Sequence, residues 1–493
     1  MMKIKQICLV SAAGVLLSAC GLMGPNYSEP NLNAPQAWRS SDQISQVEST
    51  NLAQLAWWKQ FKDAKLNQLI ESALSNNNNL QMAMGNVLQA QASLRKVNMG
   101  WVPTVALGAG GMTGQSFNPS FTNLSGYPLL NNVNTSTQGF DGYGVGIIPS
   151  YTLNVFSQIK QGEIAKLNLA LQKQATNAVR LGVISQVASS YFTLLGLQKQ
   201  LVLQQQILAD AQEMRHYTQI QYENGSVSDF NLDALDQYIA GVVGNIPSLK
   251  ANITQTENAL QVLTNNNPGK IITQNTFDQI KPDGIVPVNL PSSVLKQRPD
   301  IIAAEYQLQI ANGNIGAVTA QFFPTISLTG MLGQGSMQLN NLFSAGGDFW
   351  ATQLGVGMPL FNLGLYAEID KAKAGYYSAY YNYIQNVRSA FSQVDDGLAS
   401  HDSLNQNAIQ QKVALNKAQS LYTIAQKQYQ QGTLSYANTL GLKLNIDYAQ
   451  SNANQVKIQQ MNSLVNLYQV LGGGYQVESQ LTQIKKFGDG HDI

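Results

Sequence analysis

The sequence predicts a membrane protein of mixed α and β structure that is built from two copies of one plan. Three observations support this fold class. Beyond residue 20 there is no run of 18 or more apolar residues, so we expect no transmembrane helix. Long helical stretches with few prolines alternate with pairs of strand-like segments, and the second half of the chain repeats the order of the first. Such a chain can cross a membrane only with strands that close into a barrel.

The composition is poor in charge without being rich in apolar residues. The chain has 493 residues, of which 12% are charged and 44% hydrophobic, and Lys+Arg 29 against Asp+Glu 28 gives a net charge of +1. Asn and Gln, about 100 in number, supply the missing polarity. The neutral balance excludes a typical nucleic-acid-binding protein, which carries a basic excess, and an acidic disordered chain.

The N-terminus predicts a lipoprotein. Lys3 and Lys5 precede an apolar run over 7–17, which has the length of a signal peptide and is too short to span a bilayer. The run ends in Leu17-Ser18-Ala19-Cys20, a lipobox, so we predict lipid attachment at Cys20 and no other cofactor. An ordinary signal peptide with a chance cysteine is the alternative. Gly21 stands where an aspartate would favour the inner membrane, so we predict the outer membrane.

The first half of the mature chain predicts a helix, two strands and a long helical hairpin, in that order. Pro103 ends the first helix, and Asn224-Gly225 interrupts the hairpin. Pro247 is expected to break the second hairpin helix early. The predicted elements are a helix over 63–99, strands over 104–108 and 143–153 with a loop over 114–140 between them, and helices over 156–222 and from there to 263.

The second half repeats this plan. Tyr222-Glu223-Asn224-Gly225 and Tyr429-Gln430-Gln431-Gly432 are offset by 207 residues, so we infer an internal duplication. Phe323-Pro324-Thr325 likewise echoes Val102-Pro103-Thr104 at the start of a strand. The predicted elements are a helix over 298–321, a strand over 323–328, a Gly-rich loop over 333–347, a strand over 350–361, and helices over 366–429 and on to 471.

The long helices carry a coiled-coil seam of small and apolar residues. These residues recur in alternating steps of four and three, as in Leu171, Ala175, Ala178, Gly182, Ser185, Ala188, Phe192 and Leu195. The other faces hold uncharged polar residues, which suits a wall that water wets on both sides. An ordinary four-helix bundle is the alternative, but it explains neither the length of the helices nor the strand pairs.

The strand count predicts an assembly of several chains. Four strands are too few to close a pore, because a barrel needs about eight or more. Three chains would supply twelve strands, an even number within the range of outer-membrane barrels. We therefore expect a trimeric 12-stranded β-barrel with four strands from each chain.

Several strings spread over the chain share the pattern of one known family. They include Gly24-Pro25-Asn26-Tyr27, Trp57-Trp58 with Phe61, Asp63 and Leu66, Leu290-Pro291-Ser292-Ser293-Val294-Leu295, Arg298-Pro299-Asp300-Ile301, Phe323-Pro324 and Leu471-Gly472-Gly473-Gly474. Together they resemble the TolC-like outer-membrane efflux family, in particular its lipoprotein branch, which partners RND-type pumps. The resemblance covers almost the whole mature chain. Gln297 departs from it, since the branch usually has Arg there.

The resemblance implies a homotrimer whose barrel in the outer membrane is continued by a long α-helical barrel across the periplasm, with a tapered inner end that is closed at rest. It also implies a periplasmic adaptor protein and an inner-membrane RND-type pump as partners, and a passive exit duct for drugs or other small toxic compounds. The predicted domains are a signal peptide over 1–19, a lipidated segment over 20–62, a first repeat over 63–265, a connecting equatorial segment over 266–297, a second repeat over 298–474 and a C-terminal tail over 475–493.

An acidic pair, Asp395-Asp396, is the candidate gate. The first copy has Ala188-Ser189 at the corresponding place, so the pair distinguishes the two copies. Six carboxylates would surround the axis of a trimer if both aspartates faced inward, and a ring of carboxylates selects cations. Asp396 matches the family's aperture aspartate in the lipoprotein branch. A solvated helix face is the alternative.

Two arginines complete the candidate gate. Arg388 lies about two helical turns before the acidic pair, and Arg180 is its counterpart in the first copy. In the family a matching arginine takes part in contacts that hold the aperture shut. We therefore expect Arg388 at the gate and Arg180 in a contact between helices, with a plain surface charge as the alternative for each.

No catalytic or metal site is recognisable in the sequence. His216, His401 and His491 lie far apart with no metal-ligand spacing, and Gly142-Tyr143-Gly144-Val145-Gly146 opens a strand where a phosphate loop would open a helix. We therefore expect no enzyme activity and no metal. The alternative functions are a duct of the same fold for type I protein secretion or metal-ion efflux, and a lipid-anchored coiled-coil structural protein without a pore.

Overall fold

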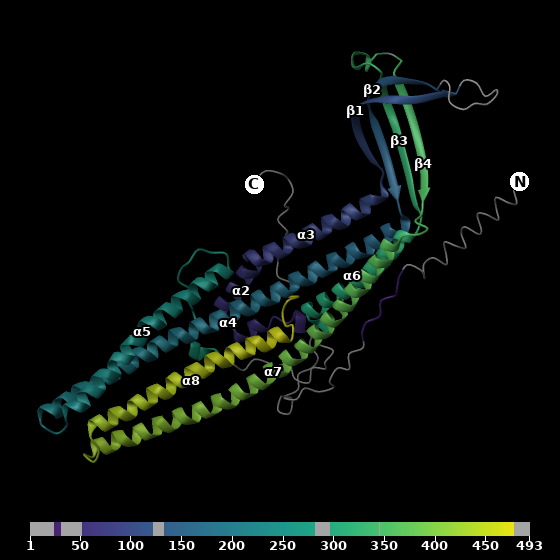
Figure 1. Cartoon of the computed structure of the whole chain (residues 1–493). Coiled ribbons are helices and arrows are strands. Elements are labelled where there is room, and N and C mark those ends of the chain that lie inside the picture. Colours follow the sequence, from purple (N-terminus) through teal and green to yellow (C-terminus); the bar gives the residue numbers. More distant parts are fainter. Residues whose placement is uncertain (1–23, 31–51, 122–132, 282–295, 345, 478–493) are drawn as a thin grey trace. The chain divides into compact units, whose positions relative to one another are not determined.

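The computed structural model describes residues 24–30, 52–121, 133–281, 296–344 and 346–477 (Figure 1). The predicted lipid site at Cys20 and the string over 290–295 lie outside these ranges. The chain divides into two compact units, which are described separately. We name the one that holds residues 1–28, 90–169 and 308–379 the strand unit, and the one that holds residues 29–89, 170–307 and 380–493 the helical unit.

The long helices lie where the sequence predicts them. Within the described residues the α-helices are α2 Ala64–Asn76, α3 Asn78–Asn98, α4 Val155–Glu223, α5 Asp229–Leu263, α6 Pro299–Thr319, α7 Leu363–Gln430 and α8 Tyr436–Val470. Short 3-10 turns cover Leu52–Gln54, Trp57–Phe61, Met99–Trp101, Phe277–Gln279, Ala320–Phe322 and Leu339–Asn341. The helix lengths match those expected for long hairpins in both copies.

The first predicted helix is divided into α2 and α3 at Asn77. This residue has an extended backbone, with φ −60° and ψ 126°. Its side-chain oxygen accepts a hydrogen bond from the backbone N–H of Leu80, and its amide donates to the carbonyl of Leu263 at the end of α5. Asn77 therefore caps the start of α3, which is a common role of asparagine that sequence periodicity does not reveal.

Pro247 does not break its helix, and this expectation was wrong. It lies inside α5, which continues to Leu263. A proline removes one backbone donor and leaves the carbonyl four residues earlier, at Val243, without its helical bond. Pro247 and Val243 are both exposed, so water can hydrate that carbonyl and the helix tolerates the loss.

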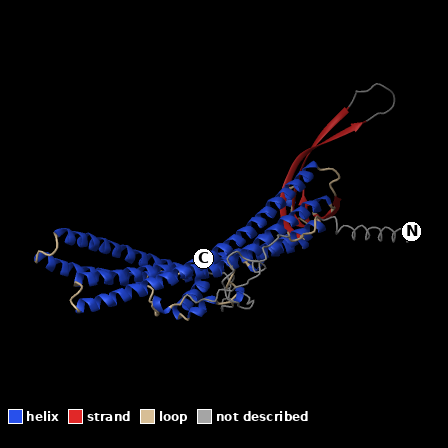
Figure 2. Cartoon of the chain, turned by 90° about the horizontal axis from the view of Figure 1, so that it is seen from below, coloured by secondary structure: helices blue, strands red, loops and turns tan. Residues whose placement is uncertain are grey.

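The two hairpin turns have the same hydrogen bonds. Gly225 and Gly432 both have left-handed backbones, with φ +68° and +73°. Each glycine N–H donates to the carbonyl of the tyrosine three residues earlier, at 2.9 Å in both turns. Glycine is favoured here because a Cβ strains this conformation. Both turns lie at the same end of the helical unit (Figures 1 and 2), as the internal duplication predicts.

The strand unit contains one antiparallel sheet in the order β1-β2-β3-β4 (Figure 1). Its strands are β1 Thr104–Phe121, β2 Val133–Leu153, β3 Thr325–Ser336 and β4 Asp348–Gly357. Both strands of the first pair extend into the predicted loop over 114–140, and β3 extends into the predicted loop over 333–347. These Gly-rich segments lack strand propensity, but an antiparallel ladder adds backbone hydrogen bonds along its whole length and stabilises them.

The two faces of the sheet differ in chemistry. The strand register brings exposed apolar side chains together on one face, namely Val105, Leu107, Ile147, Ile326, Leu328, Leu332, Trp350, Leu354 and Val356. The opposite face of the same strands carries mainly small or polar residues, among them Thr104, Gly108, Ser150, Thr329 and Gln353. Apolar residues that are exposed in a single chain and gathered on one face indicate contact with lipid or with another protein.

The main core lies in the helical unit. It joins the segment around Trp57 and Trp58 to α2, α4 and α8, and its largest buried side chains include Trp57, Trp58, Ile70, Ile184, Tyr191, Phe192, Phe277, Leu464 and Tyr468. Trp57 stacks on Tyr468 with ring centroids 4.7 Å apart. By length and composition alone, one stretch of α4 could cross a membrane, but more than half of it is buried in the chain. Burial of this kind is typical of a core helix.

Candidate functional site

The acidic pair lies near the middle of α7, in the helical unit. Asp395 is half-buried and Asp396 is exposed, where it accepts a hydrogen bond of 3.1 Å from the hydroxyl of Ser392 one turn earlier. Val394 and Gly397 on either side are buried. About 50 Å of helix separates the pair from the α7–α8 turn. The pair is therefore distant from the hairpin end, and its role as a gate stays a prediction.

Arg298 holds the surroundings of the acidic pair in place. This buried arginine donates to the carbonyl of Val470 at the end of α8 (2.8 Å), to both carboxylate oxygens of Asp300 (3.0 and 2.7 Å) and to the side-chain oxygen of Gln393 (2.8 Å). A cation at a helix C-terminus is favoured by the helix dipole. The Arg-Pro-Asp string thus joins the start of α6 to α7 and α8. Its contact on α7, Gln393, lies two residues before Asp395.

The two predicted gate arginines have different environments. Arg388 is exposed on α7, and no ion pair to it is found within the described part of the chain. Arg180 is half-buried on α4 and donates to the backbone carbonyl of Val477 at 2.6 Å, and burial lowers its pKa. Arg180 thus ties α4 to the C-terminal segment, while its predicted contact with another helix stays a prediction.

Asp63 is a buried acid of the helical unit with several hydrogen-bond donors. It is fully buried, and its Oδ1 caps α2 by accepting from the N–H of Leu66 at 2.9 Å. Its Oδ2 accepts from the hydroxyl of Tyr191 on α4 at 2.9 Å and from the amide of Asn275 at 3.0 Å. Burial, with the charge and hydrogen bond of Asp63, raises the pKa of Tyr191. This carboxylate therefore joins three segments that are distant in the sequence.

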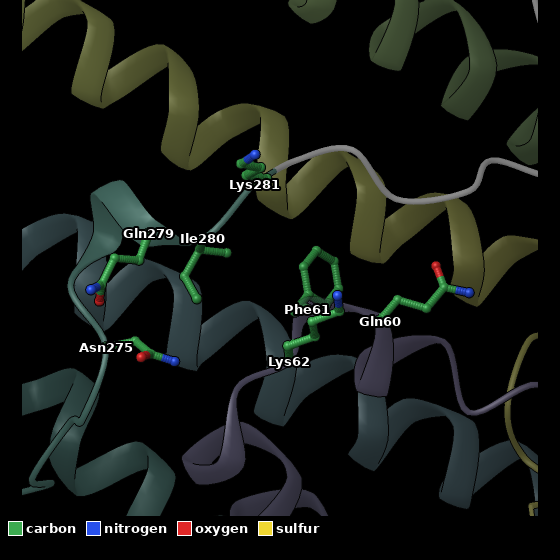
Figure 3. Close-up of a pocket in the computed structure, with 7 residues that line it drawn as sticks. All are labelled: Gln60, Phe61, Lys62, Asn275, Gln279, Ile280 and Lys281. Carbon is green, nitrogen blue, oxygen red and sulfur yellow. The ribbon is translucent and has the colours of Figure 1, made fainter.

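A cavity of about 460 Å³ lies between the turn that precedes α2 and the segment over 275–281 (Figure 3). Its seven lining residues are Gln60, Phe61, Lys62, Asn275, Gln279, Ile280 and Lys281. Lys62 has a left-handed backbone with φ +50°, which ends the short turn before α2. Two lysines and three amides make this wall polar, and none of the seven residues is acidic.

A second buried acidic cluster, which is absent from the predicted sites, lies nearer the hairpin ends. Asp210 on α4 and Asp447 on α8 are both buried, and Lys443, one turn before Asp447, donates to Asp210 Oδ1 at 2.6 Å. Gln206 donates to the same oxygen at 2.9 Å. The cluster adjoins a small apolar core of Ile207, Ala211, Val242 and Leu444. It therefore connects α4 to α8 across the two copies.

The sequence does contain a signal for this cluster. Leu440, Leu444 and Asp447 follow the four-and-three spacing of a coiled-coil seam, so Asp447 stands where an apolar residue is expected. An acidic residue at a seam position is costly to bury without a partner. The pattern thus marks Asp447 as unusual, although it does not identify Asp210 as its partner.

The outer part of the hairpins carries further polar contacts. Arg215 on α4 pairs with Asp236 on α5, and both side chains are exposed. The hydroxyl of Tyr436 at the start of α8 donates to Glu213 at 2.6 Å. Tyr217 packs edge-on against the ring of Tyr436, with centroids 4.3 Å apart. Polar and aromatic contacts thus stabilise the hairpin ends, where the described apolar core is small.

The chain combines a four-stranded sheet that has an apolar face with a long helical hairpin that occurs twice. These features define a channel subunit of the outer membrane. The sequence model of the family described as "Outer membrane efflux protein" matches residues 69–266 and 290–473, and the chain belongs to this family. The two matches correspond to the two copies. The family consists of channels without enzymatic activity, so the predicted fold class, outer-membrane location and absence of an enzyme function are confirmed.

The relatives cover nearly the whole chain. The chain is 30% identical over 464 residues to the cation efflux system protein CusC of Escherichia coli O6:H1, with 93% of this chain and 97% of that protein covered. It is 29% identical over 489 residues to the probable efflux pump outer membrane protein TtgC of Pseudomonas putida, with 97% and 98% covered. The open state of the Neisseria gonorrhoeae MtrE outer membrane channel has a TM-score of 0.76 at 26% identity, over 92% of this chain and 98% of that one.

Proposed function

We propose that three copies of this chain form the outer-membrane exit channel of a tripartite efflux system. The observation that carries the proposal is the apolar face of the sheet. Side chains such as Leu107, Trp350 and Leu354 are largely exposed in the single chain, at 79%, 75% and 71%. The opposite face is small and polar, as expected for strands with lipid on one side and a water-filled lumen on the other.

The free edges of the sheet support assembly into a trimer. In the order β1-β2-β3-β4, the outer strands β1 and β4 each have one neighbour within the described chain. Unpaired edges are unfavourable in a membrane, because no water is present to satisfy the backbone groups. Pairing of β1 with β4 of another copy removes both edges, and three copies supply a barrel of twelve strands.

A pair of matched substitutions on β4 tests the orientation of the sheet. Leu354→Arg places a charge on the proposed lipid face, which costs about 2–4 kcal/mol at the membrane midplane. Gln353→Arg places the same charge on the proposed lumen face. We expect the first variant to be depleted from outer membranes and the second to insert normally. Normal insertion of Leu354→Arg would contradict the proposal.

Planar-bilayer recording tests whether the protein is a channel. We expect the purified protein to give discrete conductance steps, because the assembled barrel encloses water. Complete absence of conductance in both the wild type and the Arg388→Ala variant would favour the alternative, a lipid-anchored coiled-coil protein without a pore. A Cys20→Ser variant that loses labelling by radioactive palmitate would support lipid attachment at Cys20.

The cargo is proposed to be drugs or other small toxic compounds. The relatives include an efflux pump protein and a cation efflux protein, so metal ions are the second candidate cargo. The partners are a periplasmic adaptor and an inner-membrane RND-type pump, and the pump supplies the energy through the adaptor. A deletion strain distinguishes the two cargoes. Increased sensitivity to antibiotics and solvents supports the first, and increased sensitivity to metal cations alone supports the second. Export of a protein substrate would instead indicate type I secretion.

The gate is proposed to involve Asp395, Asp396 and Arg388. In a trimer the exposed Arg388 can pair with an acidic group of a neighbouring copy, since the described residues of one chain hold no ion pair to it. The test is the conductance of Arg388→Ala trimers in planar bilayers. We expect it to exceed that of the wild type, and an unchanged conductance would reject the role of Arg388.

A further inference from the structure

The cluster of Asp210, Lys443 and Asp447 has one positive charge for two buried carboxyl groups. Asp210 and Asp447 have only 2% and 5% of their surface exposed. Lys443 binds Oδ1 of Asp210, and the Oδ2 atoms of both aspartates are buried without a donor. Buried carboxylate oxygens are costly to leave without a hydrogen-bond donor.

A proton shared between the two carboxyl groups would balance the charge and supply a hydrogen-bond donor. Asp447 lies one helical turn after Lys443, which binds Asp210, and the proximity of Asp210 raises the pKa of Asp447. Two carboxyl groups can form a hydrogen bond with each other only when one of them is protonated. With Asp447 protonated, Asp210 charged and Lys443 charged, the cluster is neutral. When Asp447 loses its proton, the cluster carries a net negative charge in a buried place, and the hydrogen bond between the two acids is lost.

The surrounding groups raise the pKa of Asp447 into the neutral range. Burial raises the pKa of Asp447, the hydrogen bond and charge of Asp210 raise it further, and Lys443 opposes them, which leaves it at about 7. Burial lowers the pKa of Lys443, but the hydrogen bond and charge of Asp210 and the charge of Glu213 raise it on balance, so the ammonium stays charged. The titratable groups that face the cluster are Asp210 and Glu213 on α4, Tyr238 on α5, Tyr422 on α7, and Lys443 and Tyr448 on α8.

We propose that Asp210, Lys443 and Asp447 form a proton-operated latch that holds α8 against α4 near the hairpin ends. The latch is closed when the two acids share a proton and is weakened when both are ionised. Since the folded protein holds this proton more tightly than the unfolded chain does, the stabilisation is complete below the ordinary pKa of an aspartate and is lost progressively as the pH rises through the folded-state pKa of about 7. Among the described residues a small apolar core reinforces this contact. Loss of the contact therefore destabilises the hairpin locally.

Hydrogen exchange of the full-length protein in detergent tests the latch. Exchange is measured at pH 6 and pH 8, corrected for the intrinsic rates, in peptides over 200–216 and 436–450. We expect the opening equilibrium of these peptides to rise about tenfold between the two pH values. A peptide over 456–468, which lies in the main core, should show no comparable change. Equal protection of the latch peptides at both pH values would overturn the proposal.

Two variants distinguish the latch from a general effect of pH. Asp447→Asn mimics the protonated acid. We therefore expect its latch peptides to be protected from hydrogen exchange at pH 8 as well as at pH 6. Asp236→Asn, in the exposed pair with Arg215, is the matched control and should keep the wild-type response. Asp210→Asn removes the other member of the acid pair and should also abolish the response. Retention of the wild-type pH dependence by Asp447→Asn or by Asp210→Asn would reject the latch.

Discussion

Asp63 and Asp447 are both buried aspartates of the helical unit, but their surroundings give them different properties. Asp63 accepts hydrogen bonds from Leu66, Tyr191 and Asn275, which satisfy both of its oxygens. Asp447 has an Oδ2 without a donor and faces a second acid, Asp210. Burial alone does not determine the properties of a carboxyl group. Hydrogen-bond donors stabilise the carboxylate form, whereas a neighbouring acid favours the protonated form. The first site therefore acts as a fixed support, and the second responds to pH.

The largest expected effect is at the fixed site. Asp63→Ala removes the cap of α2 and leaves the hydroxyl of Tyr191 and the amide of Asn275 without their acceptor. We expect a loss of about 4 kcal/mol in the free energy of unfolding, since several hydrogen bonds to a buried charge are lost together. Thermal unfolding followed by circular dichroism measures this. Asp63→Asn keeps an acceptor oxygen and should lose less, and equal losses would contradict this account.

The second effect is at the latch. Lys443→Met removes the only cation of the cluster and leaves two buried acids. At pH 8 we expect a loss of about 2–3 kcal/mol, because a buried charge is left without its partner. At pH 6 the loss should be smaller, since protonation can neutralise one acid. Unfolding curves at the two pH values provide the measurement. A loss that is independent of pH would show that Lys443 contributes by packing alone.

A smaller effect is expected from Tyr191→Phe. This substitution removes one of three donors to Asp63 and leaves the packing of the ring in the main core intact. We expect a loss of about 1.5–2 kcal/mol, typical of a hydrogen bond to a charged group. The loss should be the same at pH 6 and pH 8, because the substitution removes one hydrogen bond and leaves the other two donors of Asp63 in place. A loss that differs between these pH values would show that Asp63 is less fixed than we infer.

The smallest effect is expected at the exposed pair of Arg215 and Asp236. The hydrogen bond with Arg215 lowers the pKa of Asp236, but both side chains are open to solvent. Exposed ion pairs contribute little to stability and are screened by salt. We therefore expect Arg215→Ala to leave the unfolding temperature unchanged within error. A clear decrease that disappears in high salt would show that this pair also holds the hairpin.

Much of the fold could be predicted from the sequence because it is encoded locally. The helices follow from periodicity, and Gly225 and Gly432 mark the turns because their left-handed backbones favour glycine. The lengths of β1 and β2 were underestimated, since their Gly-rich parts are stabilised by pairing with each other rather than by propensity. The prediction at Pro247 was wrong because the energetic cost of a proline within a helix depends on whether the carbonyl that loses its hydrogen bond faces water.

The candidate sites were predicted less completely, for a physical reason. The acidic pair at Asp395 and Asp396 stands out in the sequence as an asymmetry between the two copies, but the bonds of Arg298 to Gln393 and to the end of α8 appear only in the fold. Asp447 and Asp210 come from different copies and become partners only when α8 packs on α4. No local pattern contains such a pairing.

The sequence by itself determined the class of this protein. The duplication, the hairpins and the four strands follow from the order of its residues, and the scarcity of charge follows from its composition. The tertiary structure decided which charged groups meet. The pKa of a carboxyl group depends on burial and on neighbours within a few ångströms, and those neighbours come from distant parts of the chain. Asp63 and Asp447 are the same amino acid, and only the fold makes one a fixed support and the other a proton-binding site.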